Sequence, residues 1–206
     1  MINKKEDLLN NAFDLFMQYG VRSVTMDDIA KKLGISKKTI YQYVDNKKNL
    51  IGTVIINYLE KDEQDILNIS KEAESAIAEM YALAKHVNQF LMRMKPTLMY
   101  DLQKYYREEW LLIRKKHFAF IQNIIRKNIE RGKTENLYRM DIDAEIISRF
   151  YTKASECATD EQIFPSTEYL KPNLFLEHLT YHLYGLVNDR GREYLNKKNL
   201  KTESNA

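Results

Sequence analysis

Apolar residues recur at three- and four-residue steps along most of this 206-residue chain, and few helix-breaking residues interrupt them. The chain contains only 3 prolines and 6 glycines, whereas a protein built from strands and turns needs many of them. Valine and threonine rarely alternate with polar residues, so the sequence contains no series of strand signals. These patterns predict an all-α fold.

The same spacing, together with helix caps and glycines, indicates where the helices lie. The expected helices cover residues 4–19, 25–33, 36–43, a long stretch from about 46, and then 73–94, 98–105, 107–131, 143–159 and 172–187. Gly132 is expected to mark a helix boundary. The tail after Arg190 is rich in Lys, Asn and Ser, and we expect it to fray.

Composition argues against disorder, secretion and membrane insertion. Hydrophobic residues make up 44% of the chain and charged residues 30%, as in ordinary globular proteins. The longest stretches without a charged residue, 49–59 and 178–188, are far shorter than the about 20 residues of a membrane-spanning helix. The first seven residues lack the apolar core of a signal peptide, and the single cysteine, Cys157, excludes an internal disulfide. We therefore expect a cytoplasmic protein with no membrane partner.

The positive charge of the chain is concentrated at its start. Residues 1–50 hold 9 Lys or Arg and 6 Asp or Glu, which accounts for the whole net charge of +3. Within residues 36–48, four lysines accompany a single acid, Asp45. A local excess of this kind is typical of a nucleic-acid-binding surface, although a solvated helix surface would look the same from charge alone.

Residues 25–44 carry the signals of two short helices joined by a tight turn. Thr25 and Ser36 can each cap a helix, and Gly34 permits the left-handed conformation that the turn requires. Ala30 is small enough to lie where two helices cross steeply. The expected buried residues are Ile29, Leu33, Ile35 and Ile40, and the expected outward residues are Lys37, Lys38, Thr39 and Gln42. A short helix with a basic, polar outer face suits the major groove of DNA, and an ordinary helical hairpin is the alternative.

The run Gly-Ile-Ser-Lys-Lys-Thr-Ile-Tyr-Gln-Tyr-Val-Asp-Asn-Lys-Lys-Asn-Leu, residues 34–50, resembles the TetR family of bacterial transcriptional regulators. The resemblance extends over about residues 4–51, with Tyr43-Val44 in place of the frequent His-Phe or Tyr-Phe. It implies an N-terminal three-helix DNA-binding module with a helix-turn-helix, residues 1–46. It also implies a larger helical domain, residues 47–206, that binds an effector and dimerises.

The resemblance assigns DNA contacts to a set of polar residues in the N-terminal module. Those at or near base edges are Lys37, Lys38, Thr39 and Gln42, and those at phosphates are Thr25, Tyr41, Tyr43 and Lys47, with the capping residue Ser36 counted among the contacts. The chemistry fits, because lysine donates to guanine, glutamine pairs with adenine, and tyrosine hydroxyls donate to phosphate. The ring of Tyr43 could equally serve in packing.

The last two long helical segments each have an apolar face. The resemblance implies that these helices pair with their copies in a homodimer, through Phe150, Ala154, Phe175, Leu179, Leu183 and Leu186. Burial inside one subunit is the alternative. His178 and His182 have the four-residue spacing of metal ligands, but no third ligand lies on that face. We therefore expect no metal site and assign the two histidines to hydrogen bonding at the interface.

The middle helices carry aromatic and sulfur-containing residues with a few polar tips. The candidate effector-binding residues are His86, Phe90, Met94, Trp110, Phe118, Ile121 and Tyr151. Such residues suit a small apolar effector, but a filled core has the same composition.

These observations together predict a ligand-responsive transcriptional regulator, a repressor that binds a near-palindromic site on double-stranded DNA and is released by a small apolar effector. A DNA-binding dimer without an effector, acting as an architectural or adaptor protein, remains an alternative. A helical-bundle di-iron enzyme would need Glu-x-x-His pairs, and no histidine of this chain is preceded by glutamate at that spacing. The chain also lacks a Gly-rich phosphate loop, so we expect neither an enzyme nor a cofactor.

Overall fold

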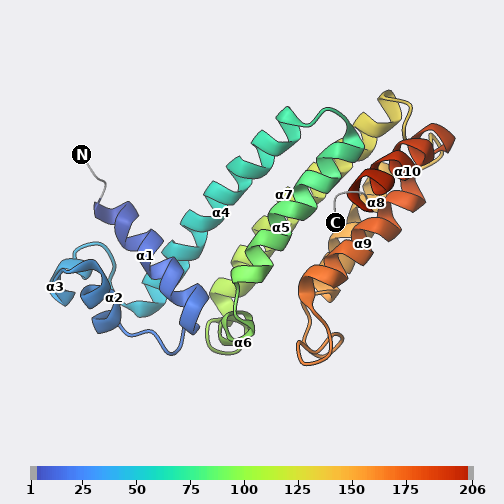
Figure 1. Ribbon diagram of the computed structural model, residues 1–206. Helices are drawn as coiled ribbons and strands as arrows, with labels where there is room; N and C mark the ends of the chain where they lie inside the picture. Colours follow the sequence, from blue (N-terminus) through green and yellow to red (C-terminus); the bar gives the residue numbers. More distant parts are fainter. Residues whose placement is uncertain (1–3, 204–206) are drawn as a thin grey trace. The chain divides into compact units, whose positions relative to one another are not determined.

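The computed structural model describes residues 4–203, and its regular elements in that range are helices (Figure 1). They are α1 Lys4–Tyr19, α2 Met26–Leu33, α3 Lys37–Ile40, α4 Lys47–Glu72, α5 Ala76–Arg93, α6 Pro96–Tyr105, α7 Arg107–Thr134, α8 Ala144–Cys157, α9 Lys171–Leu186 and α10 Asp189–Glu203. The prediction of an all-α fold is confirmed. Within the described range, no helix is both long enough and apolar enough to cross a membrane.

The helices form two compact units. The first contains the residues up to Asp65 together with Phe90–His117, and the second contains Ile66–Gln89 and the residues from Phe118 onward. This division differs from the expected boundary between residues 46 and 47. The physical reason is that α4 and α6 complete the hydrophobic core of the N-terminal helices, through Leu50, Leu98 and Leu102. As a functional division, residues 1–46 and 47–206 stay a prediction.

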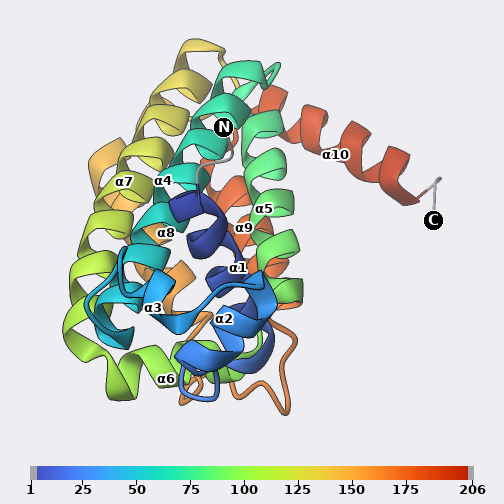
Figure 2. The same ribbon diagram turned by 90° about the vertical axis from the view of Figure 1, so that its left-hand side faces the viewer.

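The first unit has the N-terminal helices around one core. Phe16 of α1, Ile29 of α2 and Ile40 of α3 are almost completely buried in it. Figure 2 shows α2 and α3 beside each other at the front, with α1 next to them. Gly20 ends α1 in the left-handed conformation, with φ of 81°, as expected for a glycine after a helix end.

The third helix is shorter than expected. The sequence predicts it to reach about Tyr43, but α3 ends at Ile40. The amides of Gln42 and Tyr43 donate to the carbonyls of Thr39 and Ile40, three residues back, so the chain tightens there into a narrower turn.

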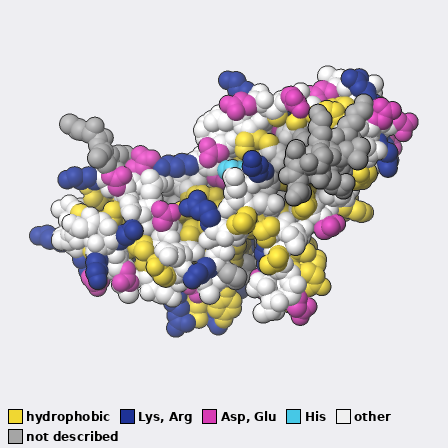
Figure 3. All heavy atoms as spheres, in the orientation of Figure 1, with side chains coloured by type: hydrophobic (Ala, Val, Ile, Leu, Met, Phe, Trp, Pro, Cys, Tyr) yellow, Lys and Arg dark blue, Asp and Glu magenta, His cyan; other side chains and the backbone are white. Residues whose placement is uncertain are grey.

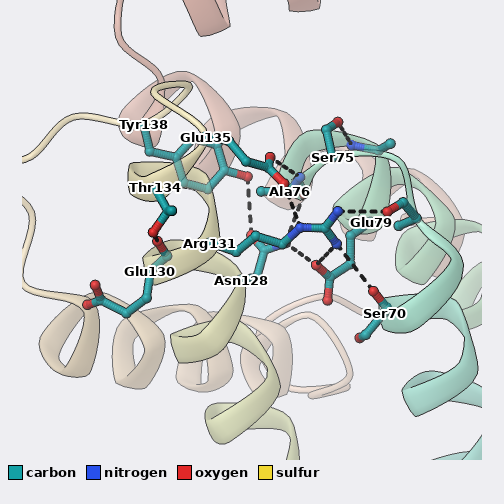
Figure 4. A network of polar contacts seen from close by, with 12 residues as sticks. Ser70, Ser75, Ala76, Glu79, Asn128, Glu130, Arg131, Thr134, Glu135 and Tyr138 are labelled. Atoms are coloured by element: carbon teal, nitrogen blue, oxygen red, sulfur yellow. Dashed lines mark hydrogen bonds and ion pairs between the residues drawn. The ribbon is translucent and has the colours of Figure 1, made fainter.

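The second unit contains a buried polar network that joins α7 to the turn between α4 and α5 (Figure 4). The Arg131 guanidinium donates to the carbonyls of Ser70 and Ala73, at 3.2 and 2.7 Å, and so caps the C-terminal end of α4. It also pairs with Glu79, which is 4% exposed, and with Glu135. Glu135 accepts the first amide of α5, that of Ala76, at 2.8 Å. One network therefore satisfies the ends of two helices.

Gly132 lies inside α7, so the prediction that it marks a helix boundary is wrong. A β-carbon at this position would collide with the ring of Tyr138, which is completely buried. Glycine thus lets an aromatic ring pack directly on the helix backbone, and α7 continues to Thr134.

The expectation that the chain frays after Arg190 is also wrong, because α10 occupies this stretch. Its first part packs into the second unit: Leu195 is 1% exposed, and Gly191 lies against the carbonyl of Leu137. Arg192, Glu193 and Asn196 are exposed, so the described part of this helix has one buried and one solvent-facing side.

Candidate nucleic-acid interface

The start of α2 is held by a reciprocal cap between Thr25 and Asp28. The Thr25 hydroxyl accepts the Asp28 amide at 3.1 Å, and the Asp28 carboxylate accepts from the amide and the hydroxyl of Thr25 at 2.8 and 2.7 Å. These hydrogen bonds from Thr25 hold the pKa of Asp28 below its ordinary value. The expected helix cap is therefore present, while a phosphate contact by Thr25 stays a prediction.

A tight turn connects α2 to α3. Gly34 adopts the left-handed conformation, with φ of 64°, and the Ile35 amide donates to the Ala30 carbonyl at 3.1 Å. Ser36 then caps α3 by accepting the Thr39 amide at 3.1 Å, and the two hydroxyls lie 2.9 Å apart. Residues 25–40 thus form the helix-turn-helix that the caps and the glycine predict.

The outward face of this motif is as expected, while Leu33 and Ile35 of the inward face are only half-buried against the core. Ile29 and Ile40 are completely buried, whereas Lys37, Lys38 and Gln42 are exposed. Thr39 is half-buried because its hydroxyl turns toward Ser36.

The three exposed side chains of this face differ in their polar contacts. Lys37 pairs with Asp27 at 2.9 Å, and this carboxylate raises the lysine pKa. The pair is exposed and contributes little to stability, so Lys37 can exchange Asp27 for another hydrogen-bond acceptor at little cost. Lys38 and Gln42 have no polar side-chain partner within the described part of the chain, and both are free to bind a base edge.

The residues expected at phosphates lie beside this motif. Tyr41 is 46% exposed, whereas Tyr43 is half-buried and packs against the core, so its packing role is present and its phosphate contact stays a prediction. Lys47 begins α4, and its ammonium donates to the Arg22 carbonyl at 3.2 Å. Partial burial lowers the pKa of Lys47.

The sequence did not predict the roles of two residues that position the start of α4. Asn46 caps α4 by accepting the Asn49 amide at 2.9 Å, which an Asn directly before a helical pattern could have indicated. Arg22 holds Lys47 through its carbonyl, and a backbone contact of this kind leaves no signal in the sequence.

The seven candidate effector-binding residues are divided between the two units. Phe90, Met94 and Trp110 belong to the first unit, where they are partly buried against its core. The Phe90 ring stacks on Tyr58, which in turn stacks on Phe13, with centroids 5.3 and 4.2 Å apart. These three residues therefore pack against a core, and their part in effector binding stays a prediction. His86, Phe118, Ile121 and Tyr151 belong to the second unit.

Three of the expected dimer residues are wrong. Leu179, Leu183 and Leu186 are 1–2% exposed and lie in the core of the second unit, so they are buried within one subunit. Periodicity identified the buried face of α9 correctly but could not say what covers it. Phe175 is half-buried, and Ala154 and Phe150 are exposed, Phe150 by 68%, so all three remain available as interface residues.

His178 and His182 pack around the ring of Tyr151 instead of forming a ligand pair. Their ring centroids lie 4.4 and 4.5 Å from that of Tyr151, and the His178 Nε2 lies 3.2 Å from the Tyr151 carbonyl oxygen. Burial lowers the pKa of His182 to about 3, so this imidazole is neutral at physiological pH. Among the residues with described positions, no three His, Cys, Asp or Glu side chains gather as metal ligands.

Comparison with known proteins agrees with this architecture. Residues 8–54 match the family of bacterial regulatory proteins, tetR family. The chain is 25% identical to the uncharacterized HTH-type transcriptional regulator YvaF of Bacillus subtilis, with 63% of this chain and 70% of the relative covered. It is 22% identical to the HTH-type transcriptional repressor KstR2 of Rhodococcus jostii, with 71% and 74% covered.

A solved structure extends the likeness to nearly the whole fold. A TetR transcription regulator from Haloarcula marismortui superimposes with a TM-score of 0.73 at 15% identity, covering 91% of this chain and 100% of that one. The helix-turn-helix of residues 25–40 lies inside the segment that the family match covers. Residues 8–54 thus match the tetR family of bacterial regulatory proteins, and the chain as a whole is similar in fold to TetR-family transcriptional regulators.

Proposed function

We propose that this regulator is a repressor that binds a near-palindromic site on double-stranded DNA as a homodimer and is released by a small apolar effector. The observation that carries the DNA-binding part is the outer face of the helix-turn-helix. Lys38 and Gln42 are exposed there without polar side-chain partners in the described part of the chain, on a motif whose inner residues Ile29 and Ile40 are completely buried.

The chemistry of these side chains indicates which of them contact bases and which contact phosphates. Lys38 donates to guanine O6 and N7, and Gln42 forms two hydrogen bonds with adenine, so both read sequence. Tyr41 and Lys47 donate to phosphates and fix the register of the motif on the duplex. Repression is supported by one relative, KstR2, which is itself named a transcriptional repressor.

A homodimer is supported by an apolar stripe on α8. Ile146, Phe150 and Ala154 follow one another at four-residue steps, so they share one face of the helix, and all three are exposed. Tyr181 of α9 adds a further exposed aromatic side chain, 84% accessible. We infer that a second copy of the chain covers this stripe, because a near-palindromic site requires two recognition helices related by twofold symmetry.

The experiment that tests DNA binding is selection of sites from random duplex DNA with the purified protein. We expect a near-palindrome, on which Lys38→Ala or Gln42→Ala relaxes base preference by about 1–3 kcal/mol for each lost pair. Lys85→Ala, an exposed lysine of α5 in the second unit, is the matched control and leaves the preference unchanged. Full sequence preference in the Lys38 and Gln42 variants would contradict the proposed orientation of α3.

A DNA-binding dimer without an effector is the second candidate, favoured by one observation. Phe90, Met94 and Trp110 pack against the core of the first unit and so fill space that an effector would need. The single tryptophan allows a direct comparison by fluorescence titration with fatty acids, sterols and aromatic drugs. A ligand that saturates the signal and also releases the selected DNA supports the sensor, because an inducer must bind the released state more tightly.

A further inference from the structure

A second basic surface lies in the first unit, on α6 and on the turn between α1 and α2. It consists of Arg22, Tyr100, Lys104 and Tyr105, and we call it the α6 basic surface. The Arg22 guanidinium lies 4.8 Å from the centroid of the Tyr105 ring, and the Lys104 ammonium lies 5.0 and 5.5 Å from those of Tyr100 and Tyr105. Figure 3 shows basic and apolar or aromatic side chains together at the lower edge of the molecule, over α6.

The hydrogen bonds inside this surface leave it rich in donors. Lys104 donates to the Tyr100 hydroxyl at 2.6 Å, and Arg22 donates to the Tyr105 hydroxyl at 3.0 Å. Both tyrosine oxygens therefore act as acceptors within the protein, and both hydroxyl hydrogens remain to be donated outward. Tyr100 and Tyr105 are 53% and 42% exposed, so a partner can reach them. The surface offers an ammonium, a guanidinium and two hydroxyl donors, which suits an anionic oxygen.

Neither cation of this surface is neutralised by a carboxylate in the described part of the chain. Asp101, the acid on the same helix, is 7% exposed, and it accepts the backbone amide of Arg22 at 2.9 Å rather than the guanidinium. Two other exposed lysines of the first unit, by contrast, are paired with carboxylates: Lys48 with Glu108 and Lys61 with Glu6. The α6 basic surface therefore keeps a net positive charge.

This surface is continuous with the residues that we assign to DNA phosphates. The Lys47 ammonium donates to the Arg22 carbonyl, and the Arg22 side chain contacts Tyr105. Arg22 also lies three residues before Thr25, the cap of α2. Contacts thus lead from the start of α4 to the outer face of α6 within one unit.

We propose that the α6 basic surface binds the phosphate backbone of the DNA that flanks the site read by α3. The proposal rests on the proposed DNA-binding function and adds to it a contact beyond the helix-turn-helix. Arg22 and Lys104 supply the charge, and the Tyr100 and Tyr105 hydroxyls supply directed hydrogen bonds to phosphate oxygens. Such a contact raises affinity without reading sequence.

The test compares two duplexes that carry the same selected site, a minimal one and one extended by about ten base pairs, one helical turn, at each end. The extension should strengthen binding of the wild-type protein. Lys104→Ala should abolish that gain and reduce the magnitude of the log–log salt slope on the long duplex by about 0.9 for each lost contact, or about 1.8 for a dimer. Lys104→Arg should keep most of the gain, and Lys85→Ala should match the wild type. Thermal melting checks that each variant is folded.

The outcomes separate this proposal from the function on which it rests. If the minimal duplex is bound and Lys104→Ala binds both duplexes like the wild type, the α6 basic surface does not contact DNA and the proposal fails alone. Equal weakening on both duplexes would also overturn it, because the contact would then not lie on the flanks. If the wild-type protein selects and binds no DNA, the proposed function and this inference fail together.

Discussion

Replacing Arg131 by Met tests the polar network that joins α7 to the α4–α5 turn. The substitution removes four contacts: two to the carbonyls of Ser70 and Ala73, and two ion pairs, to Glu79 and Glu135. Losing the pair with Glu79 should cost the most stability, because the Glu79 carboxylate is buried. Within the described residues it then keeps only the hydrogen bond from Asn128 at 2.9 Å.

The magnitude follows from burial. Breaking a fully buried pair costs about 3–5 kcal/mol, and the Arg131 side chain is 31% exposed, so water can replace part of what is lost. We therefore expect the free energy of unfolding to fall by about 3 kcal/mol. For a chain of this size that corresponds to a melting temperature lower by about 6–12 °C.

Urea denaturation followed by circular dichroism measures this loss, and two variants make the comparison specific. Arg131→Lys keeps the charge but not the forked geometry, so it should lie between the wild type and Arg131→Met. Glu79→Gln combined with Arg131→Met removes the unpaired charge and should be more stable than Arg131→Met alone. A loss below about 1 kcal/mol for Arg131→Met, or no recovery in the double variant, would refute the account of the network.

Three further predictions follow from packing and burial. Light scattering should give the wild-type protein about twice the chain mass of 24.5 kDa, and Phe150→Asp should give a folded monomer. If Phe150→Asp is still a dimer, the apolar stripe on α8 is not part of the interface. Gly132→Ala should lower stability by about 1–3 kcal/mol because of the Tyr138 ring, while Gly185→Ala, with open space around it, should not; equal effects would contradict the packing argument. Burial lowers the pKa of His182 in the folded state. Below pH about 6.5 the imidazole is therefore protonated in the unfolded state but not in the folded state, and the free energy of unfolding falls as the pH drops from there toward 3. Between pH 7 and pH 5, the free energy of unfolding of His182→Leu, measured by urea titration, should fall less than that of the wild type. Equal falls in the two proteins would show that His182 does not cause this pH dependence.

The features that the sequence predicted best are those determined by neighbouring residues. The caps at Thr25 and Ser36 and the turn at Gly34 depend on a few residues in a row, and the structure has them where expected. The buried face of the helix-turn-helix followed from periodicity for the same reason.

The errors concern packing contacts that local sequence patterns do not specify. Gly132 resembled a helix end, since the sequence pattern does not indicate that the chain turns back after α7 and places the Tyr138 ring on this glycine. Leu183 resembled an interface residue, since an apolar stripe is the same whether its own chain or a second copy covers it. The aromatic residues of the middle helices were ambiguous because a filled core and a hollow site share one composition. The sequence did not predict the network around Arg131, because charged residues in a helix usually lie at the surface.

The shortness of α3 has a consequence for how this regulator can change its target. The helix spans only Lys37–Ile40, so its orientation is set by Ile40 in the core and by the caps at its two ends. Lys38 and Gln42 contribute little to either, and substituting them should leave the fold intact while altering the bases that are preferred. Under the proposed function, recognition and folding therefore depend on different side chains of this segment. Substitutions of Lys38 and Gln42 can therefore change the preferred DNA sequence without requiring compensating substitutions in the core.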